Sequence, residues 1–359
     1  MRTRRADFDY GNTRLRARKD RLLRDADYER LLGEDIEGLL RGLADTPYAP
    51  AGDPAVRGRE RLHRAVRFHL GRALEEMRSF YSGRARVLVD ALLSRFDIQN
   101  VITVMRARAH PETTVEDALA ALVPVGWLVE PLANEVLRPH ELAGVVDVLA
   151  TRMPDPEQGK VLRAALHEYE RTDDLAALER AVLTDHAARL AEQLADTGKA
   201  GATLRQFGQR EIDEHNLVVA LRLRDAIASG AQDTAPPAEA ALPGGAIPAA
   251  TLATVVPAPA AAVVTTIGRL AGGIWQTALE RWLATGDLHA LQRSLERAAI
   301  ADVTALFVNG DPLAIDIPLA YTTALQVEAR NLRLLGEAAV RGIPVEDVRA
   351  GLVWPEGRA

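Results

Sequence analysis

A frame of polar residues that occurs twice in this chain restricts the folds available to it. Residues 96–108 read FDIQNVITVMRAR, and residues 212–224 read IDEHNLVVALRLR. A weaker form opens the chain, where the apolar positions are lost and Asp20 replaces the last arginine. A frame that recurs at roughly hundred-residue intervals indicates duplicated lobes. The matching positions are Asp97 with Asp213, Asn100 with Asn216, Arg106 with Arg222, Arg108 with Arg224 and, at the start, Asp9, Asn12 and Arg18.

Each full copy of the frame predicts an amphipathic helix. Ile98, Val101 and Met105 share one face at helical spacing, and Leu217 and Leu221 occupy two of the same places in the second copy. Asp97 stands where an N-cap residue belongs, so we expect the helix to begin there. Asn100 would bond back toward that cap. Aspartate and asparagine are therefore predicted to act in caps and turns.

The arginines of the frame have two interpretations. An arginine at the edge of an apolar stripe lays its methylene groups on neighbouring helices, and Arg106, Arg108, Arg222 and Arg224 fit such a seam. The same side chains are candidates for contacts with another chain. Both interpretations stay open at this point.

Composition favours an all-α fold over the 359 residues of the chain. Alanine, leucine, arginine and glutamate are frequent, whereas aromatic residues make up only 4% of the sequence and strands favour aromatic residues. With the repeats, this length predicts three helical lobes. We expect lobes at residues 1–108, 109–228 and 267–359, with residues 229–266 between the second and the third.

Residues 229–266 change sharply in composition toward alanine, proline, glycine and threonine. Their prolines preclude one continuous helix, so we expect a flexible surface loop or linker without assigned structure. The prolines concerned are Pro236, Pro237, Pro243, Pro248, Pro257 and Pro259.

The net charge and the cysteine content exclude several classes of protein and of site. The net charge of −6 argues against a nucleic-acid-binding protein, which gathers lysine and arginine on one face. The exception is the basic run from Arg2 to Arg24, which suits an acidic partner, lipid head groups or a solvated helix face. The absence of cysteine removes disulfides and thiolate metal sites. We find no apolar stretch long enough to span a bilayer and expect a cytoplasmic protein.

No catalytic constellation is recognisable in the sequence. A phosphate-binding loop of the G-x-x-x-x-G-K-[ST] type is missing, and no G-x-S-x-G elbow occurs. Glu211 and His215 lie four residues apart on one helix face, but a single histidine without further ligands is typical of a surface pair. We therefore predict no cofactor, no metal and no small-molecule substrate, and a protein that works by binding.

The motifs together resemble a known family. They include Tyr10-Gly11-Asn12 at the start, the two full frames, and a closing helix with Leu319-Ala320-Tyr321 and then Glu328, Asn331 and Arg333. This ordered set is similar to the C subunit of V-type and A-type ATP synthases, whose eukaryotic relative is the d subunit of the vacuolar proton pump. Residues 229–266 and the third lobe, which lacks a full frame, depart from that pattern.

The resemblance implies an all-helical funnel of three similar lobes in pseudo-threefold arrangement. Such a protein is non-catalytic and peripheral to the cytoplasmic face of the membrane. It sits on the membrane rotor (proteolipid) ring, receives the central shaft and transmits torque between ion translocation and ATP synthesis or hydrolysis. Arg106, Arg108, Arg222 and Arg224 would then face the cavity or the seams between lobes. The alternative is a cytoplasmic helical-repeat scaffold for an unrelated protein.

Overall fold

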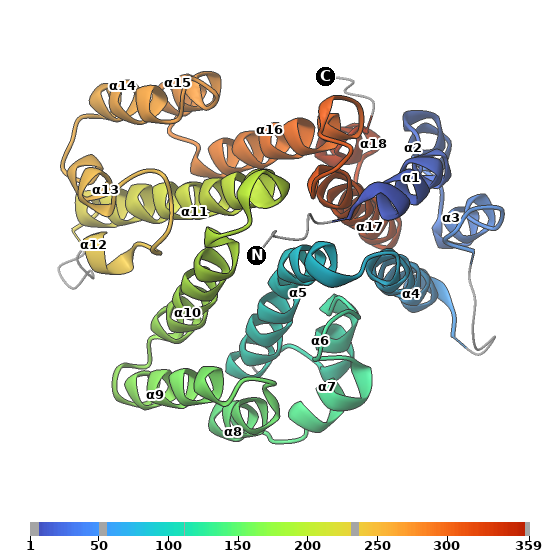
Figure 1. The fold of residues 1–359 in the computed structure, drawn as a ribbon, viewed down its shortest axis with the longest axis horizontal. Coiled ribbons are helices and arrows are strands. Elements are labelled where there is room, and N and C mark those ends of the chain that lie inside the picture. Colours follow the sequence, from blue (N-terminus) through green and yellow to red (C-terminus); the bar gives the residue numbers. More distant parts are fainter. Residues whose placement is uncertain (1–6, 50–55, 111, 231–236, 356–359) are drawn as a thin grey trace, which may run out of the picture. The chain divides into compact units, whose positions relative to one another are not determined.

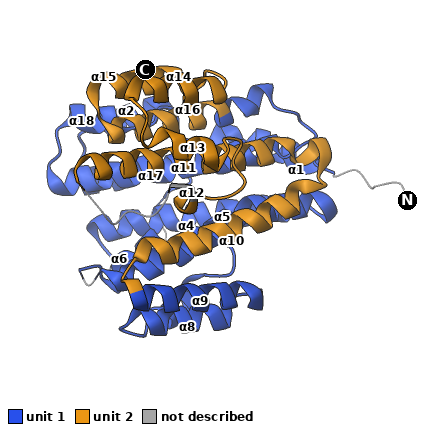
Figure 2. Cartoon of the chain, turned by 90° about the vertical axis from the view of Figure 1, so that its left-hand side faces the viewer, with its two compact units in different colours: residues 1–171, 303–359 blue, residues 172–302 orange. Residues whose placement is uncertain are grey.

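The computed structural model describes residues 7–49, 56–110, 112–230 and 237–355. Every regular element within these ranges is a helix, so the prediction of an all-α fold is confirmed (Figure 1). Contacts divide the chain into two compact units, residues 1–171 with 303–359 and residues 172–302 (Figure 2). The predicted lobe boundaries differ from these units and stay a prediction.

The first unit is organised around α17 (Asp316–Arg341), which packs against α4, α1, α3 and α18. Its side chains are buried on most sides, from Ile317 near its start to Ala338 near its end. The other helices of this unit are α1 (Asp9–Arg18), η1 (Lys19–Arg21), α2 (Asp25–Leu31), α3 (Ile36–Gly42), α4 (Gly58–Ser79), α5 (Gly83–Ala109), α6 (Val115–Ala121), α7 (Glu130–Val136), α8 (Leu142–Arg152), α9 (Pro156–Thr172) and α18 (Val345–Gly351).

The second unit is built on α11 (Ala202–Ala228). Leu217 and Leu221 of α11 lie in a core with Trp275 and Trp282, and all four side chains are buried. The remaining elements are α10 (Leu175–Ala195), η2 (Gly198–Gly201), α12 (Pro237–Ala240), α13 (Ala249–Val255), α14 (Ala260–Leu270), α15 (Gln276–Thr285) and α16 (Leu288–Asn309), the last of which continues beyond the unit boundary.

The expectation of an unstructured linker is wrong for residues 237–266. Helices α13 and α14 lie there, and Leu252, Val255 and Val263 are buried in the same core as α11. Pro248 and Pro259 are the N-cap residues of these two helices. A proline at the start of a helix removes an N–H that has no partner within the helix, so here the prolines separate short helices rather than prevent them. Residues 231–236 lie outside the described residues.

The expectation that Asp97 begins a helix is also wrong. Helix α5 begins at Gly83, so Asp97 and Asn100 lie in its middle, and Asp213 and Asn216 lie in the middle of α11. A polar residue that precedes an apolar stripe has the pattern of a cap. A buried polar side chain that bonds to another segment produces the same pattern.

Candidate functional site

The asparagine of the first frame ties two segments of unit 1 together. Asn100 is fully buried in α5. Its Nδ2 donates to the carbonyl oxygen of Val123 at 2.8 Å, and its Oδ1 accepts from the Val123 N–H at 2.9 Å. One side-chain amide thus satisfies both backbone groups of a buried residue that follows α6. We call this arrangement an amide clamp.

The same amide clamp occurs on the other two long helices. Asn216 of α11 donates to the Leu242 carbonyl at 2.9 Å and accepts from its N–H at 2.7 Å. Asn331 of α17 donates to the Val353 carbonyl at 2.7 Å and accepts from its N–H at 3.0 Å. In each case the clamped residue follows a short helix, α12 or α18, as Val123 follows α6.

The clamps bury polar groups without leaving them unpaired. An unpaired backbone group away from water costs about 1–3 kcal/mol, and each asparagine pairs with two such groups at once. The Val123 carbonyl also accepts from the Val125 N–H at 2.8 Å. A slip of the short segment by one residue would break both hydrogen bonds together. The clamp therefore fixes the register of that segment against its long helix.

The aspartates of the frame hold the turn that follows each clamp. Asp97 Oδ1 accepts from the Trp127 N–H at 2.9 Å, and Asp213 accepts from Ala246 at 3.1 Å and from Ile247 at 2.9 Å. Burial raises the pKa of Asp97 to about 6 and also raises that of Asp213, while the backbone N–H donors oppose the shift. Each carboxylate replaces its lost hydration with backbone donors.

Two glycines allow these carboxylates to approach. A Cβ on Gly126 would lie 2.0 Å from Asp97 Oδ1, and one on Gly245 would lie 2.2 Å from Asp213 Oδ1. Gly126 also has a φ of +84°, which other residues rarely adopt. Both turns therefore require glycine for a reason visible in the contacts.

We call each clamping asparagine with its nearby carboxylate a set. The third set lies on α17, where the carboxylate is Glu328 and its partners come from the start of the chain. Glu328 Oε1 accepts from the Leu23 N–H, and Oε2 accepts from the Tyr48 hydroxyl at 2.6 Å. Burial raises the pKa of Glu328 to about 7, with Tyr48 and Leu23 opposing the shift. Residues near the N-terminus thus bond to the α17 carboxylate, as the turn after α6 bonds to Asp97.

A short helix follows the bonded N–H in all three sets. Helix α7 begins three residues after Trp127, α13 begins two residues after Ile247, and α2 begins two residues after Leu23. Each of the three helices has 7 residues. The segment around α2 therefore takes, in the third set, the role that α7 and α13 have in the other two.

The four arginines of the frame divide into two pairs. Arg108 donates to the Leu137 carbonyl, and Arg224 Nε donates to the Ala258 carbonyl at 3.3 Å. Both are partly buried, whereas Arg106 and Arg222 are exposed. Arg222 lies 3.4 Å from Gln292 Oε1. The second arginine of each frame holds a downstream segment, and the first presents its charge at the surface.

The weaker frame at the start of the chain makes a different set of contacts. Asn12 donates to the carbonyls of Pro312 and Ala314 and accepts from the Tyr81 hydroxyl at 2.7 Å, so it forms no amide clamp. Arg18 pairs with Glu76, and Asp9 lies in the first turn of α1.

Arg333 of the closing helix is partly buried. Its Nη2 lies 3.4 Å from the Ala120 carbonyl, and burial lowers its pKa, with the charge of Arg67 adding to that effect. It therefore packs against the segment around α6 within unit 1.

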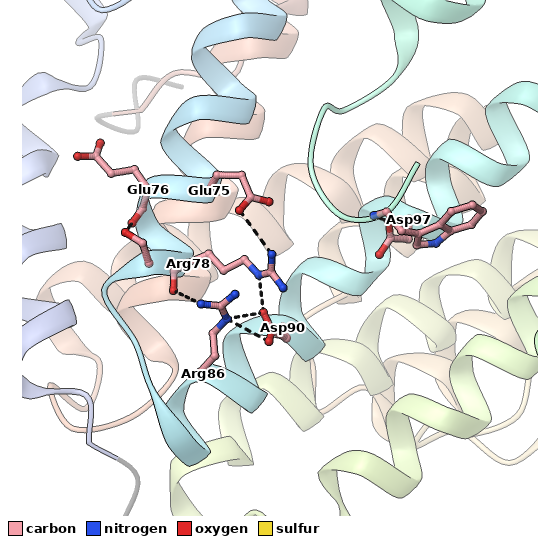
Figure 3. A network of polar contacts seen from close by, with 8 residues as sticks. Glu75, Glu76, Arg78, Arg86, Asp90 and Asp97 are labelled. Atoms are coloured by element: carbon pink, nitrogen blue, oxygen red, sulfur yellow. Dashed lines mark hydrogen bonds and ion pairs between the residues drawn. The ribbon is translucent and has the colours of Figure 1, made fainter. Parts of the chain in front are cut away.

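An ion-pair network joins α4 to α5 near the first frame (Figure 3). Asp90 Oδ1 accepts from Arg78 Nε at 2.7 Å and from Arg86 Nε at 2.8 Å, and Arg86 also donates to the Arg78 carbonyl at 3.1 Å. Glu75 Oε2 lies 3.5 Å from Arg78 Nη1 and forms a further ion pair. The network stabilises the turn between the two helices.

Sequence reasoning missed the clamped segments, although a signal was present. Residues 115–123 read VEDALAALV and residues 345–353 read VEDVRAGLV, which agree at six of nine positions. These are α6 and α18 with their clamped valines. The repeat was hidden because it lies away from the polar frame, and comparing the residues downstream of each asparagine would have found it.

Within the described ranges, no group of histidine, aspartate and glutamate side chains is arranged to hold a metal ion. In the same part of the chain, no helix combines the length and apolar character needed to cross a bilayer.

Comparison with known proteins agrees with the motifs. Residues 11–351 match the model of the ATP synthase (C/AC39) subunit family. The V-type ATP synthase C subunit of Thermus thermophilus is 30% identical over 351 residues, covering 97% of this chain and 99% of the relative. The A-type ATP synthase C subunit of Haloferax volcanii is 27% identical over 352 residues, with 96% and 97% covered. The chain therefore belongs to the ATP synthase (C/AC39) subunit family.

Proposed function

We propose that this chain is the non-catalytic adaptor of the central stalk in a V/A-type rotary ATPase or ATP synthase. It docks the central shaft onto the membrane rotor ring and transmits torque between ion translocation and ATP synthesis or hydrolysis. It works on the cytoplasmic face of the membrane and is peripheral to it through the ring. The family membership supports a place in such a complex.

The recurring amide clamp is the observation that carries the mechanical part of the proposal. A part that transmits torque has to resist shear between its helices. Asn100, Asn216 and Asn331 each hold a downstream segment by two buried hydrogen bonds. Sliding a segment along its helix would expose four polar atoms to an apolar surrounding, which supplies stiffness.

The same recurrence supports an architecture of three similar lobes. The three clamping asparagines fall one in each predicted lobe, at residues 1–108, 109–228 and 267–359, and residues 23–49 of the first lobe bond to Glu328 of the third. Three equivalent faces suit a ring of identical subunits, because several faces of the adaptor then meet equivalent surfaces.

Arg106 and Arg222 are the proposed partner contacts. They occupy matching positions, are exposed, and carry a charge that suits carboxylates or carbonyl oxygens on ring loops or shaft. Arg108 and Arg224 act indirectly, because each holds a downstream segment of its own compact unit.

A co-purification experiment tests the proposal. The tagged full chain is incubated with detergent-solubilised membranes, and the recovered proteins are identified. We expect the proteolipid ring and a shaft protein to be recovered, and the double variant Arg106→Gln/Arg222→Gln to recover less of both. Arg152→Gln/Arg163→Gln, which removes two exposed arginines of α8 and α9, is the matched control.

Recovery of neither ring nor shaft by a chain that remains helical and folded would overturn the adaptor function. The chain would then be a helical scaffold for another partner. Equal recovery by the wild type and the Arg106→Gln/Arg222→Gln variant would remove these arginines from the interface while leaving the adaptor function in place.

A further inference from the structure

A basic and apolar surface on unit 1 takes no part in the clamps. It is formed by the outer side of α1, the turn η1, and the end of α16 with the turn that follows. We call it the α1 surface, and its residues are Tyr10, Arg14, Arg16, Lys19, Val308 and Leu313.

The orientation of α1 is fixed by its buried side. Gly11, Asn12 and Leu15 face inward, and Asn12 Nδ2 donates to the carbonyls of Pro312 at 2.7 Å and Ala314 at 3.0 Å. At about 100° per residue, Tyr10 then falls on the outer side, and Arg14 and Arg16 lie on its two flanks. Asn12 also brings the turn that carries Leu313 against this helix.

Cations of this surface lie over aromatic rings and remain exposed. The Arg14 guanidinium carbon is 4.5 Å from the Phe80 ring centre and 5.4 Å from that of Tyr10. Lys19 Nζ is 5.4 Å from the Phe307 ring centre. Cation–π contacts keep the stems on apolar surface and leave the charges accessible.

Large apolar side chains are exposed beside these cations. Val308 is 74% exposed, Tyr10 61% and Leu313 37%. Among the large hydrophobic side chains of the described residues, Val308 is the most exposed. Apolar and aromatic side chains between arginines and lysines are typical of proteins that lie at a bilayer surface.

The charge of the chain is concentrated at this end. Residues 1–24 contain nine basic and three acidic residues and so carry +6, whereas the whole chain carries −6, which leaves −12 on the remainder. Asp7, Asp9 and Asp20 accompany the basic residues, Asp311 lies in the turn with Leu313, and Glu76 is already paired with Arg18. An anionic surface would therefore attract this end and repel the rest.

We infer that the α1 surface binds the surface of a bilayer that contains anionic phospholipid. The cations would meet the head groups, and Tyr10, Val308 and Leu313 would enter the boundary between head groups and acyl chains. A bilayer is favoured over an acidic protein because the exposed apolar side chains need an apolar phase as well as negative charge. Such binding would hold whether or not the chain joins a rotary complex.

Vesicle co-sedimentation of the full chain tests this inference. The vesicles contain phosphatidylcholine alone or with 30% phosphatidylglycerol (about one lipid in three, enough for a negative surface potential). We expect binding to the anionic vesicles only, weakened by salt. Arg14→Gln/Arg16→Gln/Lys19→Gln should lower the partition coefficient roughly 100-fold, since each basic residue near an anionic surface contributes about a factor of five.

A matched control removes the same charge elsewhere in unit 1. Lys160→Gln/Arg163→Gln/Arg171→Gln changes three exposed basic residues of α9 and should bind as the wild type does. Val308→Ser tests the apolar part and should weaken binding without a change of charge. Circular dichroism of each variant confirms that it remains folded.

Three results would overturn lipid binding at this surface. One is failure of the wild type to sediment with anionic vesicles. Another is an equal loss in the α9 control, which would mean that overall charge alone governs binding. The third is recovery of an acidic protein that depends on Arg14 while vesicles are ignored, which would assign the α1 surface to a protein partner.

Discussion

The hydroxyl of Tyr48 donates to Glu328 Oε2 at 2.6 Å, although the two residues are 280 positions apart in the chain. Glu328 also accepts from the Leu23 N–H, so one buried carboxylate holds two points of the N-terminal segment to α17. The closing helix of unit 1 therefore depends on residues that are made first.

Glu328 should make stability depend on pH. Its pKa is raised from 4.5 to about 7 in the folded chain, so above pH 4.5 the unfolded chain binds fewer protons than the folded one. The stabilising contribution is therefore complete below pH 4.5 and is lost as pH rises to about 7. A shift of this size corresponds to about 3 kcal/mol. Urea unfolding at pH 5 and pH 8 (roughly the two sides of this transition) measures it.

The variant Glu328→Gln separates this carboxylate from other buried acids. Glutamine does not ionise; its Oε1 can accept from the Leu23 N–H, and its Nε2 can donate to the Tyr48 hydroxyl, as a protonated Glu328 would. We expect its stability to fall less between the two pH values than that of the wild type. Glu116→Gln on the exposed side of α6 is the control. An unchanged pH dependence in Glu328→Gln would show that this group does not titrate in the folded chain.

Removing an amide clamp should destabilise the chain strongly. Asn100→Leu leaves the buried N–H of Val123 without a partner, whereas the Val123 carbonyl still accepts from the Val125 N–H at 2.8 Å. We expect a loss of about 1–3 kcal/mol in the free energy of unfolding. Asn134→Leu on the exposed face of α7 should change stability by about 0.5 kcal/mol or less. A small effect at Asn100, as measured by chemical denaturation, would contradict a stiffening role for the clamp.

The two arginines of each frame should respond differently. Arg108→Gln removes a bond from α5 to the Leu137 carbonyl and should lower the free energy of unfolding by about 1–3 kcal/mol. Arg106→Gln changes an exposed side chain and should alter it by about 0.5 kcal/mol. Thermal unfolding of both variants makes the comparison, and equal losses would argue against the division into structural and surface arginines.

Gly126→Ala should lower the free energy of unfolding by more than backbone strain alone would. The new Cβ would lie 2.0 Å from Asp97 Oδ1, in addition to a φ of +84°. Gly198 has a φ of +58° with nothing within 4 Å, so Gly198→Ala measures the strain without the clash. We expect Gly126→Ala to be less stable than Gly198→Ala by about 1–3 kcal/mol. Equal melting temperatures would show that the turn relaxes away from Asp97.

The buried part of residues 237–266 should be essential to unit 2. Leu252→Ala removes a side chain that is 1% exposed and should lower stability by about 2–5 kcal/mol. Thr254→Ala, on the exposed side of α13, is the control. A flexible linker would tolerate both substitutions, so equal stability of the two variants would contradict the packing of α13.

Sequence patterns predicted the structure correctly where the structure depends on residues close together in the chain. The all-α fold follows from composition and helical spacing. Asp174 is the N-cap of α10, and its carboxylate accepts from the Ala176 N–H at 2.9 Å, as local capping chemistry favours. The same reasoning failed at Asp97, where a polar residue before an apolar stripe indicates either a cap or a buried side chain with a distant partner. Local spacing does not distinguish the two.

The prolines around α13 illustrate a second source of error. Counting prolines predicted a linker, but Pro248 and Pro259 stand at helix starts, where their missing N–H has no effect on the helix. Whether a short helix is stable depends on the core that its apolar face meets. For α13 that core includes Leu217 of α11 and Trp275, which are distant in the chain.

The amino-acid sequence by itself determined the helical class, the recurring polar frame and the family resemblance, because these depend on residues close together along the chain. Only the tertiary structure decided what the frame does. Asn100 pairs with Val123, Asn331 pairs with Val353, and Glu328 pairs with Tyr48. These partners are fixed by the packing of whole helices, since a buried polar group takes whichever partner the apolar core brings within reach.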